Sequence, residues 1–305
     1  MKWLSHGKLV TVLQFFTDSV DDYWHILYPL SDPEKRENDP YIYFYDISRK
    51  ATDFSGPLSE DGIYLFKGYD GAWHLHALEI SQYALACWLA WRKTDDERWL
   101  TKAMLHCDWL LDKQDDDGAW RIDHKNPKYC DLPSPWPSGM AQGLAISSLL
   151  RAYEYTKEHR YLDAAVRAAV FLETEIADGG VKRIIPEGFI YEEYPREQLS
   201  GVLNGYISAL LGLYELAQYR SEYASLYSKN MENLKNILPL FDTGYWSYYA
   251  LDGTIASGFY HRYVIIQLRA LRTLDSSFEV EGQKFEHYLH CLFCMVKALW
   301  KKVRG

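Results

Sequence analysis

The sequence has 305 residues, of which 48% are apolar and 25% are charged, as is usual for a globular protein with a large core. Its formal net charge of −9 argues against a general nucleic-acid binder and against a polybasic membrane binder. Aromatic residues are abundant, with 25 Tyr, 11 Trp and 12 Phe. Packing in the core accounts for most of these side chains taken singly. So many aromatic rings with polar tips also suit a solvent-exposed groove that binds the faces of sugar rings.

The cysteines and the apolar runs predict a cytoplasmic protein. Five cysteines are an odd number in a chain too large to need disulfides, which suits a reducing compartment. No uninterrupted apolar stretch of about 18 residues occurs, so we expect neither a signal peptide nor a transmembrane segment. Cys291 and Cys294 form one C-x-x-C without a second pair, which favours core thiols on a helix over a metal site.

The first 72 residues differ in pattern from the rest. Residues 1–30 predict an amphipathic helical start, and residues 31–72 contain turn signals and a strand-like aromatic run at 41–45. We interpret 1–72 as a helix and an extended arm packed on a main domain, 73–305. The arm covers an apolar edge in the favoured interpretation, and brings tyrosines to a site in the other.

From Trp73 onwards the periodicity is helical, with Asp95 as the expected N-cap of one helix. Asp/Gly turns and short extended segments separate successive helix pairs. The predicted pairs are 73–94 with 95–114, 138–158 with 161–176, 199–219 with 222–238, and 260–274 with 279–301.

Side-chain amides recur along the first helices of these pairs. Gln82, Gln142, Asn204 and Gln267 lie 60 to 63 residues apart, which indicates a repeat. These helices are rich in small residues and poor in charge, whereas their partners carry a charged stripe. The pattern predicts an all-α fold, an α/α toroid of four helical hairpins or (α/α)4 barrel, with the amide-bearing helices inside.

A toroid of this kind gathers the N-termini of its inner helices at one end. The segments entering them, 135–138 with Trp136, 191–195 with Tyr191, and 260–261, are expected to line one cavity. Free N–H groups at helix N-termini favour a bound carboxylate, so an acidic ligand is compatible with the negative net charge.

The chain lacks phosphate-loop, dinucleotide, G-x-S-x-G and H-E-x-x-H motifs. What remains is a set of tyrosines beside carboxylates, Arg and His between the helices. Tyrosine ionises more easily near a cation or a helix N-terminus, and can then take a proton from carbon. Two such groups on opposite faces of a sugar suit abstraction of a hydrogen next to a carboxylate. Residues 115–117 are three aspartates that predict a solvated turn or, in the alternative, a calcium site.

Five segments in order resemble the C-terminal catalytic domain of the D-glucuronyl C5-epimerases. They are Ser138-Gly139-Met140-Ala141-Gln142-Gly143, Tyr191-Glu192-Glu193-Tyr194-Pro195, Val202-Leu203-Asn204-Gly205, Leu238-Pro239-Leu240-Phe241-Asp242-Thr243-Gly244 and Tyr260-His261. The resemblance implies an isomerase that turns glucuronate into iduronate in a heparan-type glycan. It implies proton removal at carbon 5, an enolate-like intermediate and return of a proton to the other face.

The resemblance places catalytic residues at Glu193, Tyr194, Tyr249 and Tyr260. The predicted substrate-binding residues are His261, Arg183, Arg262, Asn204, Gln142, Trp136 and Tyr191. Simpler roles remain open: Tyr194 could pack before Pro195, Glu193 could pair with Lys182 or Arg183, Tyr248 rivals Tyr249, and the recurring amides could bond loop backbone.

Two departures from the family concern the substrate. Family members carry an Arg shortly after the residue matching Tyr249, where this chain has Ala250-Leu251-Asp252, so the carboxylate must be bound elsewhere. The β-sandwich of larger relatives has no counterpart of its length, which favours a short or lipid-linked uronate glycan. We expect no required cofactor, with calcium or manganese left open, and a homodimer also left open. A uronate polysaccharide lyase and a non-catalytic glycan-binding protein are the alternatives.

Overall fold

The computed structural model describes residues 28–68 and 70–304, so most of the predicted amphipathic start lies outside the described residues. The fold is mostly helical with a few short strands, which confirms the predicted all-α class. Its α-helices are α2 (Pro33–Asn38), α3 (Arg49–Thr52), α4 (Ala77–Thr94), α5 (Glu97–Asp112), α6 (Gly139–Thr156), α7 (His159–Leu172), α8 (Leu203–Tyr219), α9 (Ala224–Ile237), α10 (Gly258–Arg272), α11 (Glu279–His290) and α12 (Leu292–Arg304).

Each predicted helix pair has a counterpart, and the boundaries differ for local reasons. Asp95 is not the N-cap of α5: it ends α4 in the left-handed conformation, with φ of 55°. The neighbouring Asp96 caps α5 by accepting a hydrogen bond from the backbone N–H of Arg98. The predicted last helix is two helices, because Cys291 takes an extended conformation between α11 and α12.

Helices α6 and α8 pack with their backbones in close contact, as the small residues predict. A Cβ at Gly143 would lie 2.3 Å from the Cα of Ala209, and one at Gly212 would lie 2.5 Å from the carbonyl oxygen of Gly143. Only glycine fits at such an approach. Ser148 also donates from α6 to the carbonyl of Ser81 on α4, at 2.9 Å.

The recurring amides lie on α4, α6, α8 and α10, one on each helix. Gln142 donates to the carbonyl of Gly118, and Gln267 donates to the carbonyl of Asn204, both at 3.1 Å. These two amides bond backbone, as the simpler interpretation holds. Gln82 instead accepts a hydrogen bond from Lys50.

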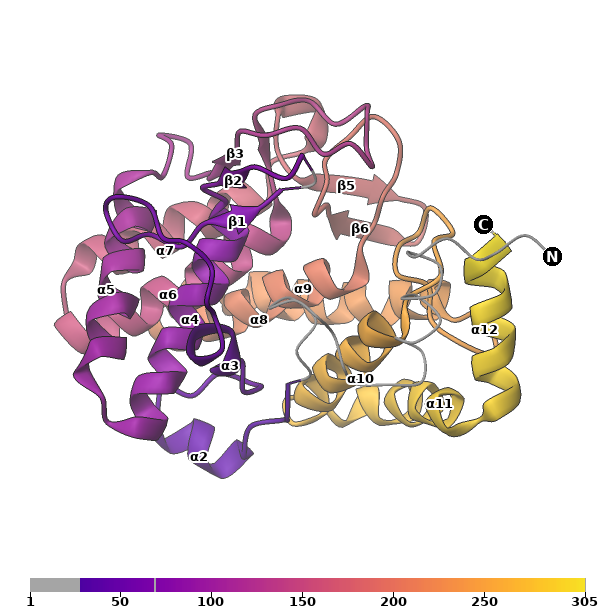
Figure 1. Cartoon of the computed structure of the whole chain (residues 1–305). Helices are drawn as coiled ribbons and strands as arrows, with labels where there is room; N and C mark the ends of the chain where they lie inside the picture. The colour runs from indigo at the N-terminus through magenta and orange to yellow at the C-terminus, as the bar shows by residue number, and fades with distance from the viewer. Residues whose placement is uncertain (1–27, 69, 305) are drawn as a thin grey trace.

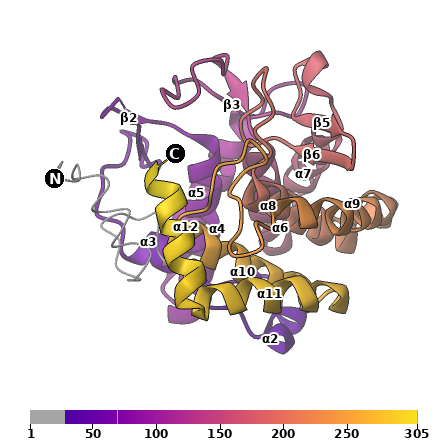
Figure 2. The same cartoon turned by 90° about the vertical axis from the view of Figure 1, so that its right-hand side faces the viewer.

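Short antiparallel strand pairs lie at one end of the helices, and α2 lies at the opposite end (Figures 1 and 2). The strands are β1 (Phe66–Lys67) with β2 (Trp73–His74), β3 (Arg121–Ile122) with β4 (Trp136–Pro137), and β5 (Lys182–Ile185) with β6 (Gly188–Tyr191). Helices α4, α6, α8 and α10 pack in chain order, and α5, α7, α9 and α11 pack against them in turn. A closed four-hairpin ring stays a prediction.

The aromatic run of the arm packs into the helical core. Tyr43, Phe44 and Tyr45 are buried, but the run forms no strand, only a single bridge between Tyr45 and Leu30. The Tyr45 hydroxyl lies 2.8 Å from that of Tyr263 on α10. Arg151 of α6 donates to the carbonyl of Tyr41 at 3.1 Å. This run therefore covers apolar helix surface.

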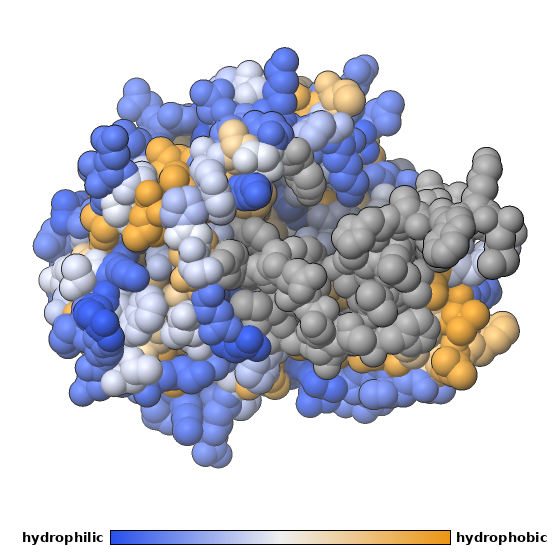
Figure 3. All heavy atoms as spheres, in the orientation of Figure 1, coloured by the Kyte–Doolittle hydropathy of each residue, from blue (hydrophilic) through white to orange (hydrophobic). Residues whose placement is uncertain are grey.

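Outside the residues drawn in grey, the face in Figure 3 is largely hydrophilic, with apolar residues gathered in a few small groups. Charged stripes on α5 and its counterparts agree with helices that have one face in water. Within residues 28–68 and 70–304, no helix is both long and apolar enough to cross a lipid bilayer.

Candidate active site

A cavity of about 280 Å³ opens at the strand-bearing end of the helices. The first turns of α4, α6, α8 and α10 all contribute to its wall, through Glu79, Met140, Asn204 and Tyr260. The convergence of inner-helix N-termini predicted from the repeat is therefore observed. The lining residues are Tyr28, Lys50, Phe66, Lys67, His76, Leu78, Glu79, Gln82, His124, Asn126, Trp136, Met140, Glu193, Tyr194, Asn204, Phe259, Tyr260 and Tyr263.

Two adjacent carboxylates after β6 have different surroundings. The Glu192 carboxylate is fully buried, binds Arg183 at 2.7 Å and accepts from the backbone N–H groups of Ser200 and Gly201. Glu193 lies in the bend that follows β6 and lines the cavity instead. Arg183 is thus bound to Glu192, and Lys182 is bound to Glu173, so neither is the partner of Glu193.

Burial raises the pKa of Glu193 from 4.5 to about 7. Tyr194 and the positive charge of Lys128 act in the opposite direction, and the negative charge of Glu192 adds to the rise. One oxygen of Glu193, Oε2, is buried without a hydrogen-bond partner among the described residues. A carboxyl group with this pKa can both accept and release a proton near neutral pH.

Tyr194 and Trp136 form one aromatic part of the cavity wall. Their ring centroids are 5.5 Å apart, and the ring of Tyr129 lies 4.8 Å from that of Tyr194. The Trp136 indole donates to the carbonyl of His124 at 3.2 Å, which fixes the ring in place. The segment between β3 and β4 therefore shapes this side of the cavity.

Tyr260 and Tyr249 form a second aromatic pair, with ring centroids 4.7 Å apart. Tyr260 lines the cavity from the first turn of α10, whose N-cap is Ser257. Tyr249 lies behind it and is not a lining residue, although the ammonium of Lys128 is 5.3 Å from its ring centroid. Tyr249 rather than Tyr248 makes this ring contact.

Several predicted substrate-binding residues lie away from the cavity. His261 is fully buried, with one ring nitrogen 2.7 Å from the Ser247 hydroxyl and the ring stacked on Trp246 at 3.7 Å. Burial lowers its pKa to about 3. Tyr191 is fully buried and donates to Glu173. These contacts give His261 and Tyr191 places in the core.

Of the remaining predicted binding residues, some line the cavity and others do not. Asn204 lines the cavity and donates to the sulfur of Met140 at 3.7 Å. Gln142 is fully buried in the core, and Arg183 and Arg262 are not lining residues. The structure thus brings Glu193, Tyr194, Tyr260, Trp136 and Asn204 together, while their roles stay predictions.

The aspartates of the turn after α5 bind an arginine. Arg121 contacts both Asp115 and Asp117 at 2.6 Å. No group of three or more His, Cys, Asp or Glu side chains is arranged to hold a metal ion in the part of the chain that the structure describes. A role for calcium or manganese stays one of the alternatives that the sequence leaves open.

Comparison with known proteins gives the family. Residues 113–286, more than half of the chain, match the family described as D-glucuronyl C5-epimerase C-terminus. The chain belongs to this family.

Two relatives show how far this membership extends. A D-glucuronyl C5-epimerase of Caenorhabditis elegans is 36% identical over 161 residues, which cover 47% of this chain and 26% of that protein. An uncharacterized protein of Methanocaldococcus jannaschii is 26% identical over 193 residues, which cover 56% of this chain and 62% of that protein. The chain thus matches about a quarter of the length of the nematode epimerase.

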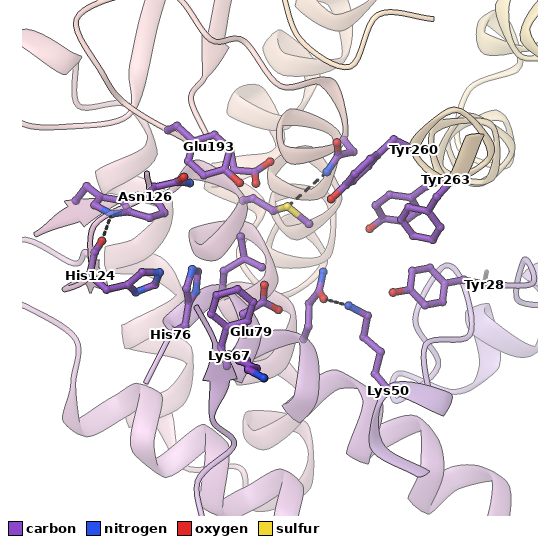
Figure 4. A pocket seen from close by; sticks show the side chains of 18 residues that line it. Tyr28, Lys50, Lys67, His76, Glu79, His124, Asn126, Glu193, Tyr260 and Tyr263 are labelled. Atoms are coloured by element: carbon purple, nitrogen blue, oxygen red, sulfur yellow. Dashed lines mark hydrogen bonds between the residues drawn. The ribbon is translucent and has the colours of Figure 1, made fainter. Parts of the chain in front are cut away.

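The opposite cavity wall contains residues that the sequence did not single out. Figure 4 shows Lys50, Lys67 and Glu79 across the cavity from Glu193 and Tyr260. All three precede the segment that matches the epimerase family. The sequence feature that could have pointed to this wall is the repeat of amides, because one of them, Gln82, is the hydrogen-bond partner of Lys50.

Two histidines of this cavity are also new. His76 and His124 line it with ring centroids 5.1 Å apart. Burial, and then the neighbouring imidazole, lowers the pKa of His76 to about 3, and burial lowers that of His124. Both imidazoles are therefore neutral near pH 7 and can exchange hydrogen bonds without adding charge. The sequence feature that could have indicated them is the pair His74 and His76, two residues apart just before α4.

Proposed function

We propose that this protein is a carbohydrate epimerase that inverts carbon 5 of a D-glucuronate residue in a glycan and so forms L-iduronate. Membership of the D-glucuronyl C5-epimerase family supports this proposal. The observation that carries it is the meeting of Glu193, with its raised pKa, and the phenols of Tyr194 and Tyr260 on one cavity.

The reaction needs only proton transfers. One of these groups removes the hydrogen from carbon 5, the electron pair moves into the carboxylate, and a second group returns a proton to the opposite face. Glu193 is suited to the first or the second step, because its pKa of about 7 gives both protonation states near neutral pH. A four-hairpin toroid is the architecture that we propose for holding these groups.

The cavity size and lining suit a sugar. About 280 Å³ is enough for one or two rings rather than for a long polymer, and Trp136, Phe66 and Phe259 offer apolar faces. A short uronate oligosaccharide, or the end of a longer chain, is therefore the substrate that we propose.

Incubation of candidate uronate glycans in heavy water tests the proposal. Deuterium at carbon 5 without an unsaturated, ultraviolet-absorbing product is the expected result. The absorbing product would instead indicate a uronate lyase, which starts from the same carbanion but expels the group at carbon 4. Binding without any exchange across the panel would leave a glycan-binding protein and contradict catalysis.

A further inference from the structure

The C-x-x-C of the sequence lies where α12 turns away from α11 (Figures 1 and 2). Cys291 separates the two helices, with φ of −93° and ψ of 105°. Its carbonyl accepts a hydrogen bond from the backbone N–H of Met295 at 3.0 Å, so Cys291 is the N-cap residue of α12. Cys294 is the third residue of that helix. The motif therefore spans the first turn of α12.

An N-cap residue and the third residue of a helix are natural side-chain partners. In a capping box, each of these side chains reaches across the first turn to the backbone N–H of the other residue. Residues three apart on a helix are neighbours, at a separation from which two cysteine sulfurs can meet. Cys294 contacts the Cys291 sulfur through both its thiol and its backbone N–H, as this geometry requires. The two thiols are thus placed to form a disulfide.

The two thiols differ in their access to solvent. Cys291 is partly exposed, whereas Cys294 is 8% exposed. The sequence favours core thiols for this motif, and Cys294 fits that expectation while Cys291 does not. Between them, Leu292 and Phe293 are 68% and 74% exposed. The outer side of this turn is therefore accessible to a reaction partner.

Hydrogen bonds to the Cys291 sulfur favour its thiolate. The thiol and then the backbone N–H of Cys294 lower the pKa of Cys291, and the N–H of Phe293 adds to this effect. Burial, and then the hydrogen bond with Cys291, raises the pKa of Cys294 to about 11. Because the thiolate is the nucleophile, the accessible sulfur is the more reactive one, and the buried sulfur keeps its proton near pH 7.

We propose that Cys291 and Cys294 are a dithiol site that exchanges with disulfides, in which Cys291 attacks and Cys294 resolves. The co-reactant is a disulfide, either a small one such as oxidised glutathione or one in a protein. Neither cysteine lines the candidate active-site cavity, so this site is separate from that of the proposed function.

The exchange balances without any other reagent. The Cys291 thiolate attacks one sulfur of the disulfide, a mixed disulfide forms, and the other sulfur leaves as a thiolate. Cys294 then gives its proton to solvent and its sulfur attacks that of Cys291, so the intramolecular disulfide forms and a second thiolate leaves. The two thiols of the protein are oxidised, and the disulfide is reduced to two thiols.

The other cysteines provide internal comparisons. Cys87 and Cys107 are fully buried, and burial raises the pKa of both thiols. Cys130 is exposed, and its sulfur lies 3.6 Å from the carbonyl oxygen of Pro127. The chain thus contains buried thiols that should be inert and an exposed thiol outside any C-x-x-C.

Oxidation of the whole chain by oxidised glutathione tests the assignment. Wild type, C291S, C294S and C130S are incubated with it, the remaining thiols are alkylated, and the peptides are mapped by mass spectrometry. In wild type, the peptide with Cys291 and Cys294 should lose two hydrogens and hold no glutathione. C294S should hold a stable glutathione adduct at Cys291, because the resolving thiol is absent. C291S should leave Cys294 unmodified.

The rate of reaction separates a reactive thiol from one that is only exposed. In C294S, Cys291 should react about 10-fold faster than Cys130 of the same protein, because serine at this position still offers an N–H and a hydroxyl to the sulfur. A rate no higher than that of Cys130, or a glutathione adduct that persists in wild type, overturns the assignment. C130S should behave as wild type, and C294A replaces C294S if that variant melts early.

A protein disulfide, oxidised protein disulfide isomerase, distinguishes the two sources. If the exposed apolar side chains of this turn dock a protein, it should oxidise wild type faster than glutathione at equal concentration. F293S should remove that advantage, whereas V280S, at a position 70% exposed on α11, should keep it. Equal rates in all three proteins indicate a small disulfide as the source. Failure of both probes to oxidise the pair overturns the proposal.

The outcome is separable from that of the proposed function. Reduced C291S and C294S should exchange deuterium at carbon 5 as wild type does, because neither cysteine lines the cavity. A protein that forms this disulfide but has no exchange activity contradicts the epimerase alone. An active epimerase in which Cys291 does not react contradicts the dithiol site alone.

Discussion

Glu193 and Lys50 face one cavity from two walls that differ in origin and in chemistry. The wall of Glu193, Tyr194 and Tyr260 lies within the segment that matches the D-glucuronyl C5-epimerase family. The other wall precedes that segment. Lys50 contributes a cation to it, and His76 contributes a neutral imidazole. The carboxyl and phenol groups of the first wall thus lie within the family match, whereas Lys50 and His76 of the second wall lie before it.

The neighbours Glu192 and Glu193 show the same division at close range. Glu192 is tied to Arg183 and to two backbone N–H groups, so it holds the loop before α8. Glu193 has an oxygen that is buried and has no hydrogen-bond partner in residues 28–68 and 70–304. Identical side chains one residue apart therefore serve structure in one case and face the cavity in the other.

The largest effect is expected from E193Q. The amide keeps the shape of the side chain but cannot carry a proton, so deuterium exchange at carbon 5 should fall about 10²- to 10⁴-fold. The matched control is E187Q, in the exposed turn between β5 and β6. Exchange in E193Q at the wild-type rate would remove Glu193 from the mechanism.

E192Q should affect stability where E193Q affects turnover. The change leaves Arg183, whose side chain is 19% exposed, facing an amide instead of a carboxylate. Breaking a largely buried pair should lower the free energy of unfolding by about 3 kcal/mol, measured by urea denaturation. E197Q alters a nearby exposed carboxylate and should cost little; equal losses in both variants would contradict the structural role of Glu192.

The raised pKa of Glu193 should make stability depend on pH. Between its ordinary value of 4.5 and about 7, the folded protein binds more protons at this site than the unfolded chain. The stability that this group contributes is therefore complete below pH 4.5 and is lost as the pH rises to 7, by on the order of 3 kcal/mol.

Unfolding experiments at pH 5 and pH 8 measure this contribution. E193Q should unfold with a smaller loss of stability between the two pH values than wild type, whereas E60Q, at an exposed site, should follow wild type. Parallel curves for wild type and E193Q would show that the carboxyl group titrates alike in both states.

The smallest effect distinguishes the two tyrosines of one aromatic pair. Y260F removes a hydroxyl from the cavity wall and should slow exchange about 100-fold. Y249F changes a ring that is 8% exposed and lies behind Tyr260, so it should slow exchange less than about tenfold. The exposed Tyr155 gives a control, Y155F. A larger effect at Tyr249 would assign the reacting phenol to that residue.

Local signals in the sequence were sufficient for the helices and for much of one wall. The small residues of α6 and α8 agree with the close contact of these two helices. The Asp95 and Asp96 pair was misassigned, because both residues are good caps and only the left-handed turn at Asp95 distinguishes them. His261 was expected at the site because it adjoins Tyr260, but adjacent helical residues point in different directions.

By itself, the sequence determined the helix pairs, the repeat of amides and the carboxylate–tyrosine segment, because each depends on neighbours in the chain. Only the tertiary structure decided which side of that segment faces the cavity, and which distant residues stand opposite. Lys50 meets Gln82 across 32 residues and faces Glu193 across 143, and no local pattern encodes such a meeting. The packing of the helices brings these side chains together, because a close-packed interior leaves the ends of the helices little freedom of position.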